Sequence, residues 1–162
     1  MGMIVTNDNF TEVFEKWKRS VFSAAYSYVL NAEDANDLMQ ETFVKLLTAD
    51  TEFEDENHLK AWLLRVCINL CISQLRSQKA HRTVELKEDI PCEQAKETGD
   101  LYAIVLSLPD KYRIPLHFFY YEEYKISEIA EILHLTPAAV KTRLKRGKAI
   151  LRRKLKREDW LC

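Results

Sequence analysis

The sequence contains only three glycines among its 162 residues. A loop that cradles phosphate groups needs closely spaced glycines, because side chains would keep the backbone amides away from the phosphate oxygens. No potential nucleophile is flanked by a base and an orienting group in a recognisable catalytic motif. These absences make an enzyme the weaker hypothesis.

Long apolar runs are also absent. The chain has no stretch of eighteen apolar residues, the length that a membrane-spanning helix needs. The N-terminus lacks a charged region followed by an apolar region and a small-residue cleavage site, which is the pattern of a secretion signal. We therefore expect a cytoplasmic protein without membrane insertion.

Potential metal ligands are few and scattered. Cys67 and Cys71 lie four residues apart on a helical segment, but no second pair and no histidine at ligand spacing accompanies them. The remaining cysteines, Cys92 and Cys162, form no cluster with the four histidines. We predict that Cys67 and Cys71 are buried thiols that act as small hydrophobic side chains, and we expect no metal and no cofactor.

Acidic residues are missing from one long segment, Thr136 to Arg157, which contains ten Lys or Arg. The whole chain nevertheless has a formal net charge of -1. Residues 1–100 hold 11 basic and 18 acidic side chains, a charge of -7, and residues 101–162 hold 13 and 7, a charge of +6. This asymmetry indicates two regions with different partners. Residues 84–100, with few large apolar side chains and no periodicity, predict a mobile linker between them.

Apolar residues recur at helical spacing on both sides of the linker. Phe10 to Phe22 and Leu59 to Leu70 predict amphipathic helices. Asn31 can cap another helix that ends near Leu47. The apolar side of that helix is predicted to consist of four residues, Leu38, Phe43, Val44 and Leu47. The acidic segment 48–57 predicts a loop.

The basic segment has the features of a folded helix. Thr136 is a suitable N-cap, Pro137 suits the first helical position, and an apolar stripe consists of Val140, Leu144, Gly147 and Leu151. A shorter helical pattern precedes it, with His134 at the turn, where a glycine is common. A solvated basic helix or tail is the simpler interpretation, but a tail needs no cap, stripe or partner helix. We therefore favour a DNA-binding helix-turn-helix.

Three segments in order resemble the extracytoplasmic-function (ECF) sigma factors of bacterial RNA polymerase. They are AEDANDLMQETFVKLL at 32–47, HLKAWLLRVCINLCISQLR at 58–76, and the stretch from Leu108 to Leu155. The resemblance implies an all-α fold with two small helical domains. A region 2-like helical bundle would occupy residues 1–83, the linker residues 84–100, and a region 4-like helix-turn-helix domain residues 101–162.

The resemblance also implies how each domain acts. The helix with Asp37, Gln40 and Glu41 would dock on the β′ clamp helices of the polymerase core. These three side chains share one helical face while Leu38 points elsewhere. From spacing alone, an ordinary solvated face is the favoured interpretation, and the family resemblance reverses that preference.

The next helix, by the same resemblance, opens the minus-ten promoter element, and the loop before it captures a flipped base. The acidic character of this loop suggests that it touches bases rather than phosphates. Trp62 could be a stacking platform, although burial is the favoured interpretation. The candidate minus-ten residues are Lys60, Trp62, Arg65, Asn69 and Arg76.

The C-terminal helix-turn-helix would read the minus-thirty-five element as a duplex. With about five phosphates neutralised, log affinity should fall with log salt with a slope of roughly -4 to -5. Part of the aromatic cluster at 117–121 would be available to the β flap. The resemblance also implies a possible anti-sigma factor, because many ECF sigma factors are controlled by one. The candidate residues on this helix are Thr136, Lys141, Thr142, Arg143, Lys145, Arg146, Lys148 and Arg152.

Two other functions remain open at this point. A stand-alone helix-turn-helix regulator, whose N-terminal half senses a signal or dimerises, would bind duplex DNA tightly without polymerase. An adaptor with a solvated basic helix would bind DNA weakly and without a salt slope. Promoter-dependent initiation with bacterial core polymerase separates all three.

Overall fold

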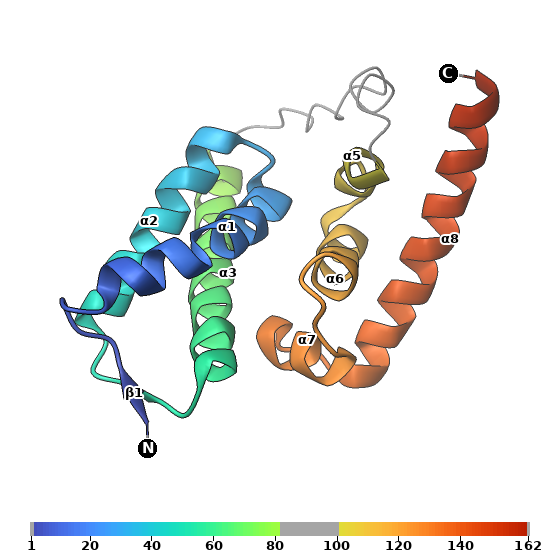
Figure 1. Cartoon of the computed structure of the whole chain (residues 1–162). Coiled ribbons are helices and arrows are strands. Elements are labelled where there is room, and N and C mark those ends of the chain that lie inside the picture. The colour runs from blue at the N-terminus through green and yellow to red at the C-terminus, as the bar shows by residue number, and fades with distance from the viewer. Residues whose placement is uncertain (1, 82–100, 162) are drawn as a thin grey trace. The chain divides into compact units, whose positions relative to one another are not determined.

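The computed structural model describes residues 2–81 and 101–161, with side chains up to residue 77 in the first part and 156 in the second. The chain divides after His81 into two compact units. Both units are helical, which confirms the predicted all-α class, and the described residues form seven helices and two very short strands (Figure 1). The predicted linker, Cys92 and Cys162 lie outside the described residues.

Unit 1 is a bundle of three helices that all pack against one another (Figure 1). They are α1 (Phe10–Val29), α2 (Ala32–Thr48) and α3 (Glu56–His81). The side chain of Asn31 caps α2 by accepting a hydrogen bond from the Asp34 amide at 2.9 Å. The predicted start of this helix is therefore confirmed, and its end lies one residue beyond Leu47.

The buried side of α2 differs from the predicted one. Leu38 and Phe43 are buried as expected, and so are Met39 and Leu46. Val44 and Leu47, predicted to face inward, are 58% and 43% exposed. Apolar residues cover more than half of the circumference of this helix, so the sequence pattern alone did not decide which of them α1 and α3 would cover.

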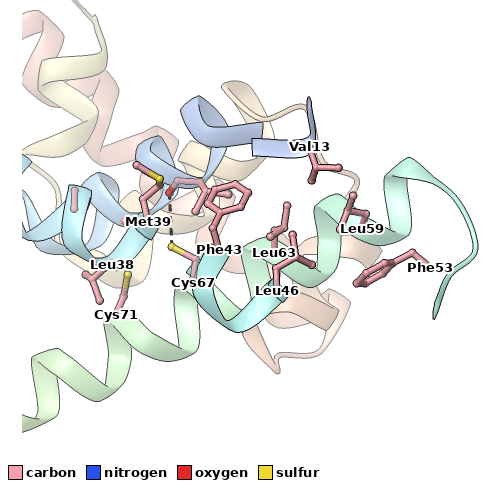
Figure 2. Close-up of a cluster of buried hydrophobic side chains, with 13 residues drawn as sticks. Val13, Leu38, Met39, Phe43, Leu46, Phe53, Leu59, Leu63, Cys67 and Cys71 are labelled. Atoms are coloured by element: carbon pink, nitrogen blue, oxygen red, sulfur yellow. Dashed lines mark hydrogen bonds between the residues drawn. The ribbon is translucent and has the colours of Figure 1, made fainter. Parts of the chain in front are cut away.

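The core of unit 1 is apolar and includes Phe43 and Phe53 (Figure 2), and partly buried aromatic side chains pack against it. Phe43 meets Phe14 edge-on, with ring centroids 4.9 Å apart. Cys67 and Cys71 are fully buried free thiols, as predicted. The Cys67 thiol donates to the Val21 carbonyl at 3.6 Å. The neighbouring Cys67 and desolvation raise the pKa of the Cys71 thiol far above its ordinary value, so this group stays protonated.

The segment 48–57 is not a plain loop. Strand β2 (Glu52–Phe53) pairs antiparallel with β1 (Met3–Ile4), with Met3 opposite Phe53 and Ile4 opposite Glu52. Phe53 is only 1% exposed. A two-residue strand has no periodicity to detect, and its partner lies almost fifty residues earlier in the chain, so sequence analysis missed it.

Unit 2 contains α5 (Leu101–Leu106), α6 (Asp110–Tyr120), α7 (Ile126–Leu133) and α8 (Pro137–Leu161). Helix α8 packs on the other three. Its predicted apolar stripe is confirmed, because Val140, Leu144 and Gly147 are buried and Leu151 is half-buried. A Cβ atom on Gly147 would approach the Leu116 side chain to 3.0 Å, so glycine allows α6 and α8 to lie close together.

Buried polar side chains connect the elements of unit 2. Arg113 is 2% exposed and donates to the carbonyl oxygen of Leu108 at 3.0 Å. His117 is fully buried, and its Nδ1 lies 3.0 Å from the Tyr102 hydroxyl. Its Nε2 lies 3.5 Å from a Glu122 carboxylate oxygen. These contacts fix α5 and the end of α6 beside the helix-turn-helix.

Candidate functional site

The start of α8 is well defined. The Thr136 hydroxyl accepts a hydrogen bond from the Ala139 amide at 3.1 Å, and Pro137 is the first helical residue, as predicted. Ala138 is exposed in the first turn. The amide groups at this end and the positive end of the helix dipole can therefore approach a phosphate closely.

The turn between α7 and α8 is made by His134, with φ 56° and ψ 42°. The amide of the following residue, Leu135, donates to the Ala130 carbonyl at 2.8 Å, which is the 6→1 bond of a Schellman motif. At the other end of α7, the Glu128 carboxylate accepts from the Lys125 amide at 3.2 Å. Glu128 thus supplies the returning half of a capping box, although Lys125 has no hydroxyl to accept from the amides of the first turn of α7.

The candidate cations of α8 fall into two groups. Lys148 is half-buried, and its ammonium lies 5.9 and 5.3 Å from the ring centres of Phe119 and Tyr120. Arg143 is also half-buried. The other candidates on this helix are exposed, and they are Thr136, Lys141, Thr142, Lys145, Arg146 and Arg152.

A groove of about 360 Å³ runs along one side of α8. Its lining includes the apolar side chains of Phe119, Ile126 and Leu144. Four cations line it, namely Lys141, Lys145, Lys148 and Arg152. Part of the basic face therefore combines charge with apolar surface.

The predicted face on α2 is present. Asp37, Gln40 and Glu41 are all exposed, and Leu38 points into the core. The exposed Val44 and Leu47 continue the same helical stripe. Val44 follows Glu41 by three residues and Gln40 by four, and Leu47 follows them by six and seven residues, so all four lie on one side of the helix. Sequence analysis missed this extension, although spacing from Glu41 could have indicated it.

The candidate residues on α3 do not form one continuous face. Asn69 and Arg76 are exposed and Arg65 is half-buried, all on one side of the helix. Lys60 instead faces α1, with its ammonium 5.6 Å from the ring centre of Trp17. Trp62 is half-buried and meets Phe53 edge-on at 5.7 Å, so its burial is only partial.

The described residues contain neither a candidate membrane span nor a candidate metal site. No helix within residues 2–81 and 101–161 has the length and hydropathy to span a bilayer. The same residues contain no group of three or more His, Cys, Asp or Glu placed to bind a metal ion.

Comparison with known proteins decides among the functions left open above. The sequence matches the family models described as Sigma-70 region 2, over residues 13–81, and Sigma-70, region 4, over residues 98–151. It is 32% identical over 147 residues to RNA polymerase sigma factor SigV of Bacillus subtilis, covering 88% of each chain. It is 27% identical over 169 residues to ECF RNA polymerase sigma factor SigW of the same species, covering 92% of this chain and 90% of that protein. The chain belongs to the ECF sigma factors of the sigma-70 family.

A solved structure supports the fold of this sigma factor. It is the sigma factor RpoE in complex with the anti-sigma factor NepR from Bartonella quintana, with a TM-score of 0.73 at 19% identity. The match covers 92% of this chain and 98% of that one. At this identity the likeness concerns the fold alone.

Family membership establishes the general function. This sigma factor is an alternative sigma factor that directs promoter-specific transcription initiation, and the family binds RNA polymerase core and promoter DNA. The stand-alone helix-turn-helix regulator is excluded, because regions 2 and 4 both occur in the chain, in the order found in sigma factors.

Proposed function

We propose that the exposed stripe of α2 docks on the β′ clamp helices of the polymerase core. The observation that supports this most strongly is the sharp division of α2 between a buried side and an exposed acidic and apolar side. Asp37 and Glu41 suit a basic partner, and Gln40 can donate to or accept from its polar groups. The exposed Val44 and Leu47 add apolar surface, which gives affinity that salt does not screen.

The basic face of α8 is the proposed minus-thirty-five reader. Lys141, Thr142 and Lys145 lie exposed in the first three turns, where a recognition helix contacts base edges. Arg146 and Arg152 would hold phosphates. The exposed Tyr120 is the proposed contact of the β flap.

The proposed minus-ten surface consists of the 48–57 segment and the side of α3 with Arg65, Asn69 and Arg76. The 48–57 segment would capture a flipped base. Asn69 and Arg76 are exposed and can follow a single strand. Lys60 and Trp62 are less accessible, so we assign them a supporting role. The chain would act by recruiting and positioning a separate enzyme, the polymerase, in the bacterial cytoplasm.

An anti-sigma factor is a further proposed partner. The Bartonella quintana sigma factor with a similar fold was solved in complex with one. A protein that covered the cations of α8 in this chain would block promoter binding, because the same side chains cannot bind both partners.

The experiment that tests the proposal changes Asp37, Gln40 and Glu41 together to Ala. We expect loss of binding to core polymerase and of promoter-dependent initiation, because three of the exposed contacts disappear without loss of core packing. Duplex affinity and its salt slope should not change, because α8 is intact. Pull-down with core polymerase, transcription of promoter DNA and duplex titration at several salt concentrations measure these quantities.

A matched control removes the same number of charges elsewhere in unit 1. Asp8 and Glu12 are exposed residues before and within α1, so Asp8→Ala with Glu12→Ala should leave core binding unchanged. Equal loss of core binding in both variants would mean that net charge, rather than the α2 stripe, determines docking. Normal core binding by the triple variant would refute the proposed docking surface.

A further inference from the structure

The N-terminal strand is attached to the segment that separates α2 from α3. Strand β1 pairs with β2 through Met3 opposite Phe53 and Ile4 opposite Glu52. An isolated two-stranded pair of this length is not stable in water. Contacts on both sides of the pair must therefore hold it.

On the N-terminal side, one side chain fixes the turn between β1 and α1. Asn9 Oδ1 accepts a hydrogen bond from the Thr6 amide at 2.7 Å, and Asn9 Nδ2 donates to the Ile4 carbonyl at 3.0 Å. The Asn9 carbonyl accepts from the Val13 amide at 3.1 Å, in the first turn of α1. Asn9 thus connects β1 to a rigid helix of the bundle.

On the other side, α3 holds β2. Phe53 is buried, and its ring lies 5.4 Å from that of His58. The Glu54 amide donates to His58 Nδ1 at 3.0 Å, and Asp55 Oδ1 accepts from the His58 amide at 2.8 Å. The β1–β2 pair therefore connects α1 to the start of α3.

We propose that β1 and Asn9 are positioning elements that hold the 48–57 segment in the shape needed to select a minus-ten base. This inference rests on the proposed function of that segment. The segment needs such a support, because its carboxylates repel one another and the DNA phosphates. These acidic residues are Asp50, Glu52, Glu54, Asp55 and Glu56. A preformed segment spends less binding energy on ordering itself, and only a fixed shape can discriminate between bases.

The test compares Asn9→Ala with the matched control Asn7→Ala, an exposed asparagine that takes no part in these hydrogen bonds. Each protein, assembled with core polymerase, transcribes a promoter library randomised over the minus-ten and minus-thirty-five elements, and the transcribed templates are sequenced. For Asn9→Ala we expect a loss of about fivefold to tenfold in discrimination at one or two adjacent minus-ten positions, as two hydrogen bonds are lost. Minus-thirty-five selection and core binding should match the wild type.

A cross-strand disulfide gives an independent test. Ile4→Cys with Glu52→Cys, in the Asn9→Ala background and with Cys92→Ser and Cys162→Ser, should discriminate better at the minus-ten element when oxidised than when reduced. Both forms lack Glu52, so the loss of that side chain cancels in the comparison. Residues directly opposite in an antiparallel pair are close enough for this bond. Equal minus-ten discrimination by the oxidised and reduced forms would count against the inference.

The remaining outcomes are equally decisive. Wild-type minus-ten selection by Asn9→Ala would overturn the inference, and so would parallel loss of minus-thirty-five selection, which indicates general unfolding. Failure of the proposed function of the 48–57 segment gives a different result from failure of this inference. In that case the wild-type protein itself would show no minus-ten selection that depends on residues 48–57.

Discussion

The two units of the chain build their interiors from different kinds of side chain. In unit 1, the buried hydroxyls of Ser27 and Thr42 each donate to a carbonyl oxygen of their own helix, at 2.6 and 2.8 Å. In unit 2, buried Arg113 and His117 reach groups outside α6. The bundle is held mainly by apolar packing, with the weak bond from the Cys67 thiol to the Val21 carbonyl between α3 and α1, whereas charged and aromatic polar side chains help to place the elements of the helix-turn-helix unit.

This difference suits the task proposed for each unit. Hydrogen bonds depend on direction, and apolar contacts depend mainly on area. A recognition helix must be oriented accurately against base edges, so polar contacts beneath it are useful. The acidic α2 stripe requires only a rigid helix. The following predictions test this contrast, beginning with the largest effect.

The largest effect is expected from Phe43→Ala in unit 1. The ring is 2% exposed and contacts the rings of Phe10 and Phe14, so its removal should cost about 3–5 kcal/mol of unfolding free energy. Unit 2 should remain folded, because it has its own core. The stability of each unit is measured by following its amide NMR signals in the full chain during urea unfolding. Simultaneous loss of both sets of signals would show that the units fold together.

A smaller effect is expected from Arg113→Met in unit 2. The change removes the donor to the buried Leu108 carbonyl and should cost about 1–3 kcal/mol. The counterpart in unit 1, Thr42→Val, removes only a bond within α2 and should cost less than about 1 kcal/mol. Urea unfolding of both variants compares them. The proposed contrast between the cores would be wrong if the two costs were equal.

The smallest effect is expected at the helix caps, where the two units should behave alike. Asn31→Ala and Thr136→Ala each remove one hydrogen bond to an exposed helix start, and each should cost about 1 kcal/mol. Thermal unfolding of each variant measures the loss of stability in the unit that carries the change. A much larger cost at Thr136 would mean that the start of α8 depends on its cap more than the packing of Val140 and Leu144 suggests.

Local signals in the sequence predicted much of the site. The cap at Asn31, the start of α8 at Thr136, and the turn at His134 follow from side-chain chemistry within a few residues. The helical face with Asp37, Gln40 and Glu41 follows from the helical period. The proposed roles of these residues came from the family resemblance and stay predictions until the experiments above are done.

By itself, the sequence determined the helical class, the starts of α2 and α8 and the opposite charges of the two regions, because each depends on composition or on residues close together in the chain. Only the tertiary structure decided that Val44 and Leu47 lie outside and Met39 and Leu46 inside, because that choice depends on which side α1 and α3 cover. It likewise decided that Phe53 is buried and that β1 pairs with β2. Contacts between residues far apart in sequence leave no local pattern, and their energy appears only when the chain is folded.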